Sequence, residues 1–317
     1  MSAIRTAGLR RVFGGVVAVA GLDLEVAAGE IFGLVGPDGA GKTTTMRMLT
    51  GILPPSGGRA EVAGFDVARD PERLKEHLGY MSQRFGLYPD LTVLENLAFY
   101  ADIYGVPRRE LAARTARLLG FSNLTPFKER LAGNLSGGMK QKLGLACALI
   151  HTPRVLFLDE PTNGVDPVSR RDFWRILYQL VREGVTIFVS TAYLDEAERC
   201  NRLALLHEGR LLGLGTPDDI KAMMPGALLE VRTAAPRRTA ALLRGRLTGA
   251  SVGLFGDRVH VAVRDAAAGE GSVRALLASA GFDLLSLRPI EPSLEDVFVS
   301  VLAARLPAAA ADAAPAP

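Results

Sequence analysis

The chain has 317 residues, of which 48% are hydrophobic and 22% charged, and this composition is typical of a globular protein. Its 37 basic and 34 acidic residues leave a formal charge of +3, which is too balanced to indicate nucleic-acid binding. No apolar run reaches the roughly 18 residues that cross a bilayer, and residues 1–15 lack the apolar stretch of a signal peptide. Cys147 and Cys200 show neither a disulfide framework nor metal-ligand spacing, so we expect reduced thiols in the cytoplasm.

Apolar runs and helix-like segments alternate through the first two thirds of the chain, which predicts an α/β domain. In chain order, residues 22–36 predict a strand, a turn and a buried strand, and residues 43–53 predict the helix that follows. The apolar runs at 155–160 and 186–191 are typical of strands buried in a parallel sheet.

A second module follows, with predicted elements in the order β-α-β-β-α-β, which is typical of a small ferredoxin-like α+β module. These elements are strands at 227–233, 250–255, 257–264 and 282–288 and helices at 236–247 and 271–280. A closing amphipathic helix is expected at 293–306, and the Ala- and Pro-rich tail at 307–317 is expected to be disordered. We therefore expect an α/β domain at 1–222, with a helical subdomain at about 85–150, and an accessory module at 225–306.

The segment GPDGAGKTT at 36–44 fits the phosphate-loop pattern in full, between a predicted buried strand and a predicted helix. Backbone N–H groups and the helix N-terminus favour the phosphates of ATP, with Lys42 on the β- and γ-phosphates and the Thr43 hydroxyl on Mg²⁺. The alternative is a glycine-rich turn with a chance lysine, and the flanking elements argue against it. The candidate nucleotide-binding residues are Gly36, Pro37, Asp38, Gly39, Ala40, Gly41, Lys42, Thr43 and Thr44.

Asp159 and Glu160 end the apolar run that begins at Val155. Because consecutive side chains of a strand point to opposite faces, both carboxylates can reach one site only at the end of the strand. We predict that Asp159 is a Mg²⁺ ligand and that Glu160 polarises the attacking water. The alternative is a strand that ends in two solvated acids.

The segment LSGGMKQ at 135–141 places a serine and two glycines at the start of a predicted helix, where N–H groups and a hydroxyl face an anion. With the phosphate loop and the carboxylate pair, it resembles the nucleotide-binding subunits of ABC transporters over about residues 3–220. The resemblance implies a P-loop NTPase with a RecA-like core, an antiparallel β subdomain and a helical subdomain. It also implies that this motif contacts ATP held by another subunit's phosphate loop. The candidate residues of the motif are Ser136, Gly137 and Gly138.

The resemblance extends to single positions elsewhere in the chain. Phe13 matches the aromatic residue that stacks on adenine, and Gln83 matches the glutamine that reaches Mg²⁺ and the attacking water. Asp166 matches the aspartate that crosses the dimer interface. The positions that match the family's surface for a coupling helix of the membrane subunit are Phe85, Leu87 and Tyr88. Without the resemblance, Phe13 and these apolar residues would be assigned to core packing.

Ala192 departs from the family, which has at this position a histidine that contacts the γ-phosphate. A methyl group cannot donate a hydrogen bond, and losing one preorganised contact to a transferring phosphoryl group raises the barrier by about 3 kcal/mol. We therefore expect strong ATP binding and impaired turnover at this chain's own phosphate loop. In a dimer with a histidine-bearing second nucleotide domain, one site would be active and the other slow.

The resemblance implies an ATPase subunit that binds ATP and Mg²⁺ on the cytoplasmic face of the membrane and powers export through a membrane-spanning permease. A second nucleotide-binding domain, from a homo- or heterodimer, is the other implied partner. EPSLEDVF at 291–298 resembles exporter ATPases that act with separate membrane subunits. One alternative is a slow or non-hydrolysing regulatory subunit, supported by Ala192 and opposed by Glu160. The other is a soluble ABC ATPase without a membrane partner, opposed by the single nucleotide domain and the small net charge.

Overall fold

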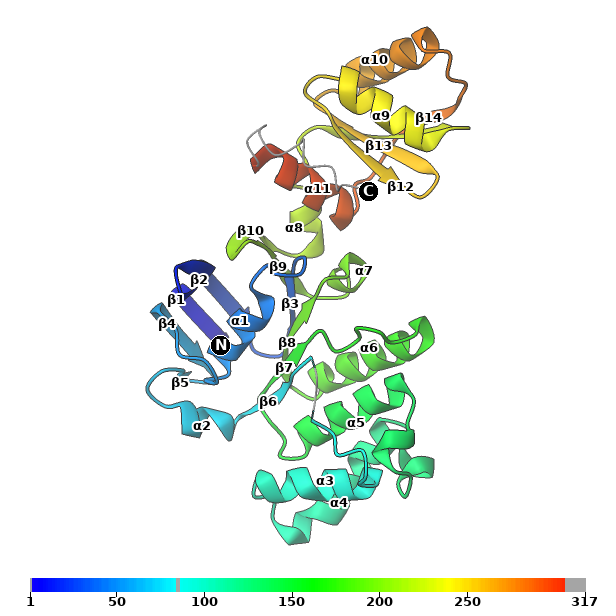
Figure 1. Cartoon of the computed structure of the whole chain (residues 1–317). Coiled ribbons are helices and arrows are strands. Elements are labelled where there is room, and N and C mark those ends of the chain that lie inside the picture. Colours follow the sequence, from blue (N-terminus) through cyan, green and yellow to red (C-terminus); the bar gives the residue numbers. More distant parts are fainter. Residues whose placement is uncertain (1, 84–85, 306–317) are drawn as a thin grey trace. The chain divides into compact units, whose positions relative to one another are not determined.

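The computed structural model describes residues 2–83 and 86–305 (Figure 1). The chain divides into two compact units, Met1–Gly213 and Leu214–Pro317, and each is described by itself. Phe85 and the tail at 307–317, for which we made predictions, lie outside the described residues. Within the described residues, no helix is long and apolar enough to cross a membrane.

A six-stranded sheet in the order β10-β9-β3-β8-β7-β6 forms the centre of unit 1. Its strands are β3 (Ile31–Val35), β6 (Leu78–Met81), β7 (Val155–Asp159), β8 (Thr186–Thr191), β9 (Arg202–His207) and β10 (Arg210–Gly215). The pairs β9–β3, β3–β8, β8–β7 and β7–β6 are all parallel. The apolar runs predicted as buried strands at 155–160 and 186–191 are confirmed as β7 and β8. The ends of β3, β8 and β7 therefore lie in a row at one edge of the sheet.

Both faces of this sheet are covered, which explains why its strands are apolar without alternation. Leu156 and Leu158 of β7 pack into a core with the helical layer. Val155 and Phe157, which point to the other face, pack into a core with the antiparallel sheet. All five residues of β7 are buried, so the strand and the carboxylate that ends it are held rigidly.

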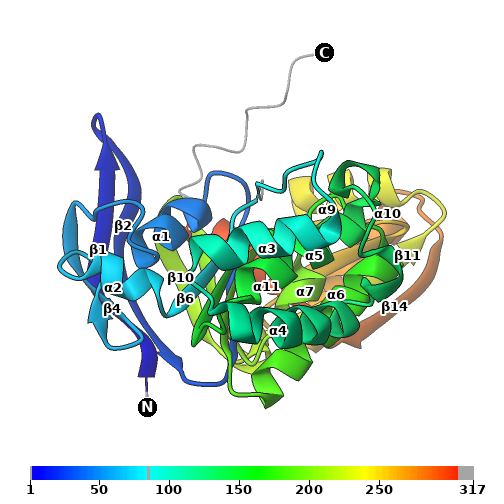
Figure 2. The same cartoon turned by 90° about the horizontal axis from the view of Figure 1, so that it is seen from below.

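An antiparallel sheet in the order β2-β1-β4-β5 lies on one side of the parallel sheet in unit 1, and the helical layer lies on the other (Figures 1 and 2). Its strands are β1 (Ser2–Phe13), β2 (Val16–Ala27), β4 (Gly57–Val62) and β5 (Phe65–Asp66), with helices α1 (Lys42–Leu49) and α2 (Pro71–Lys75) nearby in sequence. The strand-turn-strand prediction for 22–36 is confirmed by β2 and β3.

The helix predicted at 43–53 is too long, because α1 ends at Leu49. Gly51 has a φ of +71°, and the N–H of Ile52 donates to the carbonyl of Arg47 at 3.0 Å. This is the left-handed glycine closure that ends many helices. The prediction ran too far because Ile52 and Leu53 continue the apolar pattern of the helix beyond Gly51, the residue that ends it.

The helical layer of unit 1 contains three helices within the interval of about 85–150 for which we expected a helical subdomain. They are α3 (Val93–Ile103), α4 (Arg108–Phe121) and α5 (Gly137–Leu149), joined by 3-10 turns at Thr125–Phe127 and Ala132–Asn134. The helices α6 (Pro167–Arg182) and α7 (Leu194–Ala197) follow β7 and β8. Thr92 and Glu95 form a capping box at the start of α3, and Ser136 and Asp166 cap α5 and α6.

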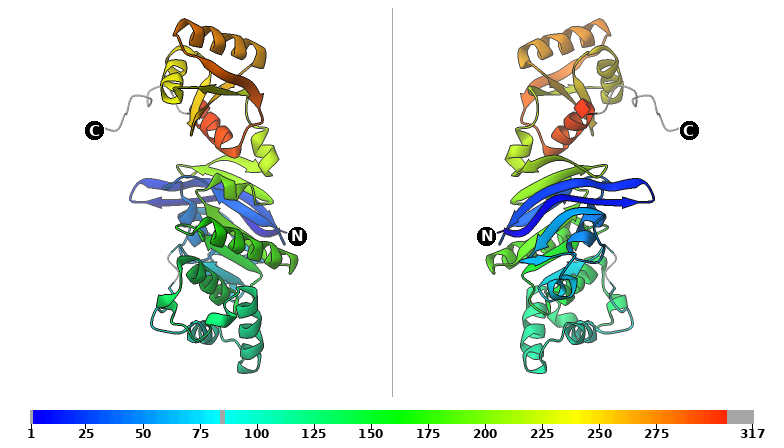
Figure 3. Two further views of the ribbon diagram at one scale, coloured as in Figure 1. Left: turned by 90° about the vertical axis from the view of Figure 1, so that its right-hand side faces the viewer. Right: turned by 90° about the vertical axis from the view of Figure 1, so that its left-hand side faces the viewer.

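Unit 2 has the predicted order β-α-β-β-α-β after a short helix, α8 (Pro217–Lys221). Its elements are β11 (Ala227–Thr233), α9 (Pro236–Arg246), β12 (Ser251–Phe255), β13 (Arg258–Val263), α10 (Ala266–Ser279), β14 (Leu284–Ile290) and α11 (Leu294–Arg305). The strands pair antiparallel in the order β12-β13-β11-β14, which is the ferredoxin-like arrangement. Helices α9 and α10 cover one face of this sheet and α11 lies against the other (Figures 1 and 3).

Two details of unit 2 could not be predicted from the pattern. The helix expected at 271–280 begins at Ala266, because the Asp265 carboxylate accepts the N–H of Ala268 at 2.8 Å and caps it. In the EPSLEDVF segment, Ser293 donates to Asp296, which also receives Nδ1 of His260 at 2.7 Å. Burial opposes ionisation of Asp296, but the hydrogen bonds from His260 and Ser293 outweigh it and hold its pKa below the usual range. The segment thus ties α11 to β13.

Candidate nucleotide-binding site

The phosphate loop joins the buried strand β3 to α1, as predicted. Gly41 precedes the helix with a φ of +99°, and a Cβ at this position would meet the carbonyl oxygen of Ala18 at 2.5 Å. Only glycine satisfies both conditions, so the backbone can turn tightly into the helix N-terminus. The first turn of α1 carries no acidic residue that would compete with a bound phosphate.

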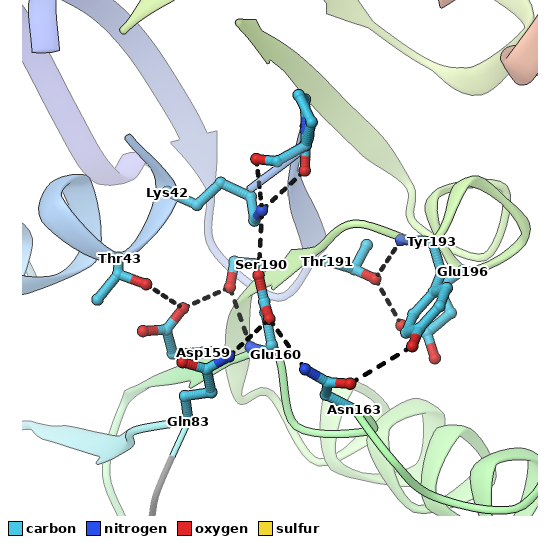
Figure 4. Close-up of polar contacts among 12 residues, drawn as sticks. Lys42, Thr43, Gln83, Asp159, Glu160, Asn163, Ser190, Thr191, Tyr193 and Glu196 are labelled. Atoms are coloured by element: carbon cyan, nitrogen blue, oxygen red, sulfur yellow. Dashed lines mark hydrogen bonds and ion pairs between the residues drawn. The ribbon is translucent and has the colours of Figure 1, made fainter. Parts of the chain in front are cut away.

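Lys42 is folded back over the phosphate loop. Its Nζ atom donates to the carbonyl oxygens of Gly36 and Pro37 at 2.7 and 3.0 Å and lies 3.0 Å from Oε1 of Glu160 (Figure 4). The side chain is only 4% exposed. A buried ammonium beside a loop of N–H donors is chemically suited to the phosphates of a nucleotide.

Asp159 ends β7 as a fully buried carboxylate. Its Oδ1 atom accepts the hydroxyls of Ser190 at 2.7 Å and Thr43 at 3.2 Å, and its Oδ2 atom lies 3.5 Å from the hydroxyl of Tyr80. Burial and the neighbouring Asp159 charge raise the pKa of Tyr80 to about 12, so the phenol stays protonated. Thr43 and Asp159 thus place two oxygen ligands of the kind that Mg²⁺ prefers beside the phosphate loop.

Glu160, just after β7, has a strained backbone and accepts hydrogen bonds from neighbouring side chains. Its φ is +49°, and its N–H donates to the hydroxyl of Ser190 at 3.0 Å. The Oε2 atom accepts Nε2 of Gln83 at 2.9 Å and Nδ2 of Asn163 at 3.4 Å (Figure 4). A left-handed non-glycine residue at a site is the kind of strain that packing must hold in place. Gln83, Lys42 and Glu160 are therefore brought together from three separate segments.

The end of β8 lies between the ends of β3 and β7, and Ala192 directly follows it. Thr191 donates to Oε2 of the buried Glu196 at 2.8 Å, and Thr162 donates to Oε1 of the same residue. Glu196 thereby ties the segment after Glu160 to the segment after β8. Ser190 and Glu196 were missed as site residues, because only the topology reveals that β8 and the segment after it adjoin the carboxylate pair. Asn163 was also missed, although it lies only three residues after Glu160.

The residues of LSGGMKQ lie at the N-terminus of α5. The Ser136 hydroxyl accepts the N–H of Met139 at 3.3 Å. Gly138 packs so closely on α6 that an added Cβ would lie 2.5 Å from both Cβ and Oγ of Ser169. Asp166 caps α6, and its hydrogen bonds with Ser169 lower its pKa. These residues form a second cluster, which we call the signature cluster: Ser136, Gly137, Gly138 and Asp166.

The two remaining predictions concern exposed apolar side chains. Phe13 ends β1 and is 43% exposed, with the Arg11 guanidinium 4.4 Å from its ring centre. Tyr88 is exposed and packs edge-on against Phe99, while Leu87 is partly buried against the core of the helical layer. The exposed side chains of Phe13 and Tyr88 can contact a ligand or another protein, whereas Leu87 also packs against the core of the helical layer.

Comparisons with known proteins identify the family of the chain. The model of the ABC transporter family matches residues 19–163. Over 221 residues, 69% of this chain, the sequence is 54% identical to the probable multidrug ABC transporter ATP-binding protein YbhF of Escherichia coli. The matched region spans only 38% of the length of that relative.

Other relatives match along most of their length. The daunorubicin/doxorubicin resistance ATP-binding protein DrrA of Streptomyces peucetius is 36% identical over 94% of this chain and 92% of its own. The Nod factor export ATP-binding protein I of Rhizobium sp. is 38% identical over 94% of this chain and 96% of its own. The solved structure of cbiO1 from Clostridium perfringens, part of an ABC transporter complex, has a TM-score of 0.65 and 28% identity over 70% of this chain and 91% of its own. The resemblance and the fold class inferred from the sequence are confirmed, and the chain belongs to the family of ABC transporter ATP-binding proteins.

Proposed function

We propose that the chain is the ATP-binding and ATP-hydrolysing subunit of an exporter that acts through a partner membrane-spanning permease. The observation that carries the proposal is the convergence of Lys42, Gln83 and Glu160 beside a phosphate loop. The relatives that match along most of their length include a drug-resistance and an export ATP-binding protein, which supports the direction of transport.

Each residue of the site has a distinct role in the proposed reaction. Lys42 leaves Glu160 and contacts the β- and γ-phosphates, while the N–H groups from Gly36 to Thr44 surround them. Thr43, Asp159 and Gln83 would hold Mg²⁺, and the ion would neutralise part of the phosphate charge. The oxygen atoms of Thr43 and Asp159 fit this ion, because Thr43 Oγ1 and Asp159 Oδ1 lie 3.2 Å apart beside the phosphate loop.

Glu160 is the proposed general base. Once Lys42 is on the phosphates, the carboxylate is free to accept a proton from a water molecule aligned with the γ-phosphate. Gln83, which already donates to Glu160 at 2.9 Å, orients the same water. The preorganised contacts hold the base in place before the reaction begins.

A second nucleotide-binding domain completes the proposed site. The hydrogen bonds that the described residues show for Ser136 and Asp166 go to the first turns of their own helices, α5 and α6, which supports a role for the signature cluster on another subunit's ATP. The capped N-terminus of α5 presents N–H groups to an anion there, and Phe13 stacks on adenine. ATP binding would close two such domains head to tail, and hydrolysis would reopen them, moving the permease on the cytoplasmic face of the membrane.

Ala192 favours a second candidate function, a slow regulatory subunit in a heterodimer. Its methyl group offers no contact to a γ-phosphate, while the signature cluster remains able to serve a partner's site. The retained Glu160, Gln83 and Lys42 favour hydrolysis instead. ATP turnover by the chain alone and with a second ATPase subunit separates the two functions.

The test is to express the chain with a candidate membrane-spanning permease and to purify the pair from detergent by a tag on the permease. The proposal predicts that the chain co-purifies and that the complex hydrolyses ATP only with Mg²⁺. A chain that hydrolyses ATP but never co-purifies supports a soluble ABC ATPase. A complex that binds ATP without turnover supports the regulatory subunit.

A further inference from the structure

A line of three side chains connects the end of β8 to the proposed general base. The hydroxyl of Tyr193 lies 3.4 Å from Oδ1 of Asn163, and Nδ2 of Asn163 lies 3.4 Å from Oε2 of Glu160 (Figure 4). Tyr193 follows Ala192, so it is the first side chain beyond β8 that carries a polar group toward this site. Neither Tyr193 nor Asn163 was among the residues predicted from the sequence.

Two contacts hold Tyr193 in place, a hydrogen bond from its backbone N–H and a guanidinium group over the face of its ring. Its N–H donates to Oγ1 of Thr191 at 3.0 Å, and Thr191 is itself bound to the buried Glu196. The Arg170 guanidinium lies 4.4 Å from the ring centre and 3.3 Å from Glu196. The same buried carboxylate therefore fixes the backbone of Tyr193 and the cation that covers its ring, and these contacts favour the ring position in which the hydroxyl faces Asn163.

Glu160, as the final acceptor, determines which group donates and which accepts in the contacts among Tyr193, Asn163 and Glu160. An ionised Glu160 can only accept, so Asn163 must present its NH₂ group to the carboxylate and its carbonyl oxygen to Tyr193. The Tyr193 hydroxyl then acts as the donor. It favours the amide orientation that stabilises Glu160 and disfavours the flipped one, which would place two oxygen atoms together.

This support becomes more important when nucleotide binds. Nζ of Lys42 lies 3.0 Å from Oε1 of Glu160, and in the proposed reaction that contact is lost when the ammonium moves to the phosphates. Among the described contacts of the carboxylate, those from Gln83 and Asn163 to Oε2 then remain. Ala192 has no group to replace the lost contact.

We propose that Tyr193 and Asn163 are positioning residues for Glu160, acting in series so that the tyrosine orients the amide and the amide orients the base. The inference rests on the proposed ATPase function. It does not require either residue to touch the nucleotide, and ATP affinity is therefore not expected to depend on them.

The kinetic test compares Tyr193→Phe, Asn163→Ala and their combination, with Tyr178→Phe as the matched control. Tyr178 is a comparable exposed tyrosine whose hydroxyl donates to the carbonyl of Arg199 at 3.2 Å, away from Glu160. We expect Tyr193→Phe to lower kcat about 3- to 10-fold with unchanged KM for ATP, as loss of one neutral hydrogen bond predicts. The double variant should be no slower than Asn163→Ala alone, because the residues act in series.

A second measurement does not need turnover. The chain has five asparagines, so ¹⁵N-asparagine labelling gives a simple set of side-chain amide resonances, and Asn163→Ala identifies the relevant pair. Tyr193→Phe should shift the Asn163 pair, and Tyr178→Phe should leave it in place.

The two readouts separate the possible failures. A shifted Asn163 resonance in a chain that hydrolyses no ATP even in complex with the permease contradicts the proposed function and leaves the connection between the residues standing. An active chain in which Tyr193→Phe matches the control in kcat, or in which the Asn163 resonance does not move, overturns the inference. An additive double variant also contradicts it, because independent effects are incompatible with action in series.

Discussion

Replacing Gly138 with alanine tests the close contact between α5 and α6 that positions the signature cluster. The new Cβ would lie 2.5 Å from Cβ and Oγ of Ser169, whereas carbon atoms normally approach to about 3.5–4.0 Å. The hydroxyl can rotate away, but the Ser169 Cβ cannot, so the two helices must separate by roughly 1 Å. Overpacking of this kind costs about 1–3 kcal/mol of the free energy of unfolding.

Gly137 supplies the matched control, because a Cβ at this position meets no atom within 4 Å. Alanine has a higher helix propensity than glycine at both positions, by up to about 1 kcal/mol, so the informative quantity is the difference between the two variants. We expect Gly138→Ala to be less stable than Gly137→Ala by about 1–3 kcal/mol. Each kcal/mol corresponds to about 2–4 °C in the melting temperature of a domain of this size.

The assay is urea or thermal unfolding of the full chain, followed by circular dichroism. Ser169→Gly in the Gly138→Ala background should restore stability, since it removes both clashing atoms. Ser169→Ala should not, because the Cβ remains. Equal stability of the Gly137→Ala and Gly138→Ala variants would refute the close packing and, with it, the geometry of the signature cluster.

Three further predictions concern the loop, the end of β8 and unit 2. Lys42→Ala should weaken ATP binding about 10- to 150-fold in equilibrium titration, because a charge-assisted contact to the phosphates is lost. Ala192→His should raise the kcat of the purified chain at least about tenfold, and an unmodified chain that is already fast alone would contradict the slow-site hypothesis. Because the folded-state pKa of Asp296 is lowered, its ionisation stabilises unit 2, and this stabilisation is fully present above the unfolded-state pKa of about 3.9. The stabilisation is lost as the pH falls through the folded-state pKa. Acid unfolding monitored by circular dichroism should therefore show less pH dependence below about pH 4 in Asp296→Asn than in the unmodified chain.

The central residues of the site could be predicted because they lie in short contiguous segments of the sequence. The phosphate loop carries its glycines, Lys42 and Thr43 within nine residues, and Asp159 and Glu160 follow a fully apolar run. Their flanking elements, β3, α1 and β7, follow from the same local pattern. The ferredoxin-like order of unit 2 could also be predicted, since each strand and helix there has its own periodicity.

The supporting contacts could not be predicted in the same way. Asn163 meets Tyr193 across 30 residues of chain, and Ser190 meets Asp159 across 31, because the strand order brings β7 and β8 together. In the sequence, Glu196 cannot be distinguished from the other acidic residues of its charged helix. In the structure, it is fully buried between two threonines and Arg170. Only the pairing of strands distinguishes such a residue from its solvated neighbours.

The boundaries that were wrong have local causes. Gly51 ends α1 while the apolar pattern continues, and Asp265 begins α10 before the pattern becomes clear. In both cases a single hydrogen-bonding or backbone feature overrides the periodicity. Such features are visible in the sequence but are weak signals against a continuing hydrophobic pattern.

The most direct test of the account is the Mg²⁺-dependent ATPase rate of the complex with its permease, measured for the unmodified chain and for Glu160→Gln. The variant keeps the size and polarity of the side chain but cannot act as a base. The account predicts that kcat falls about 100-fold or more. ATP binding should be equal or tighter, because Lys42 no longer has to leave a carboxylate. Unchanged turnover in Glu160→Gln would contradict the assignment of Glu160 as the base on which the proposed mechanism depends.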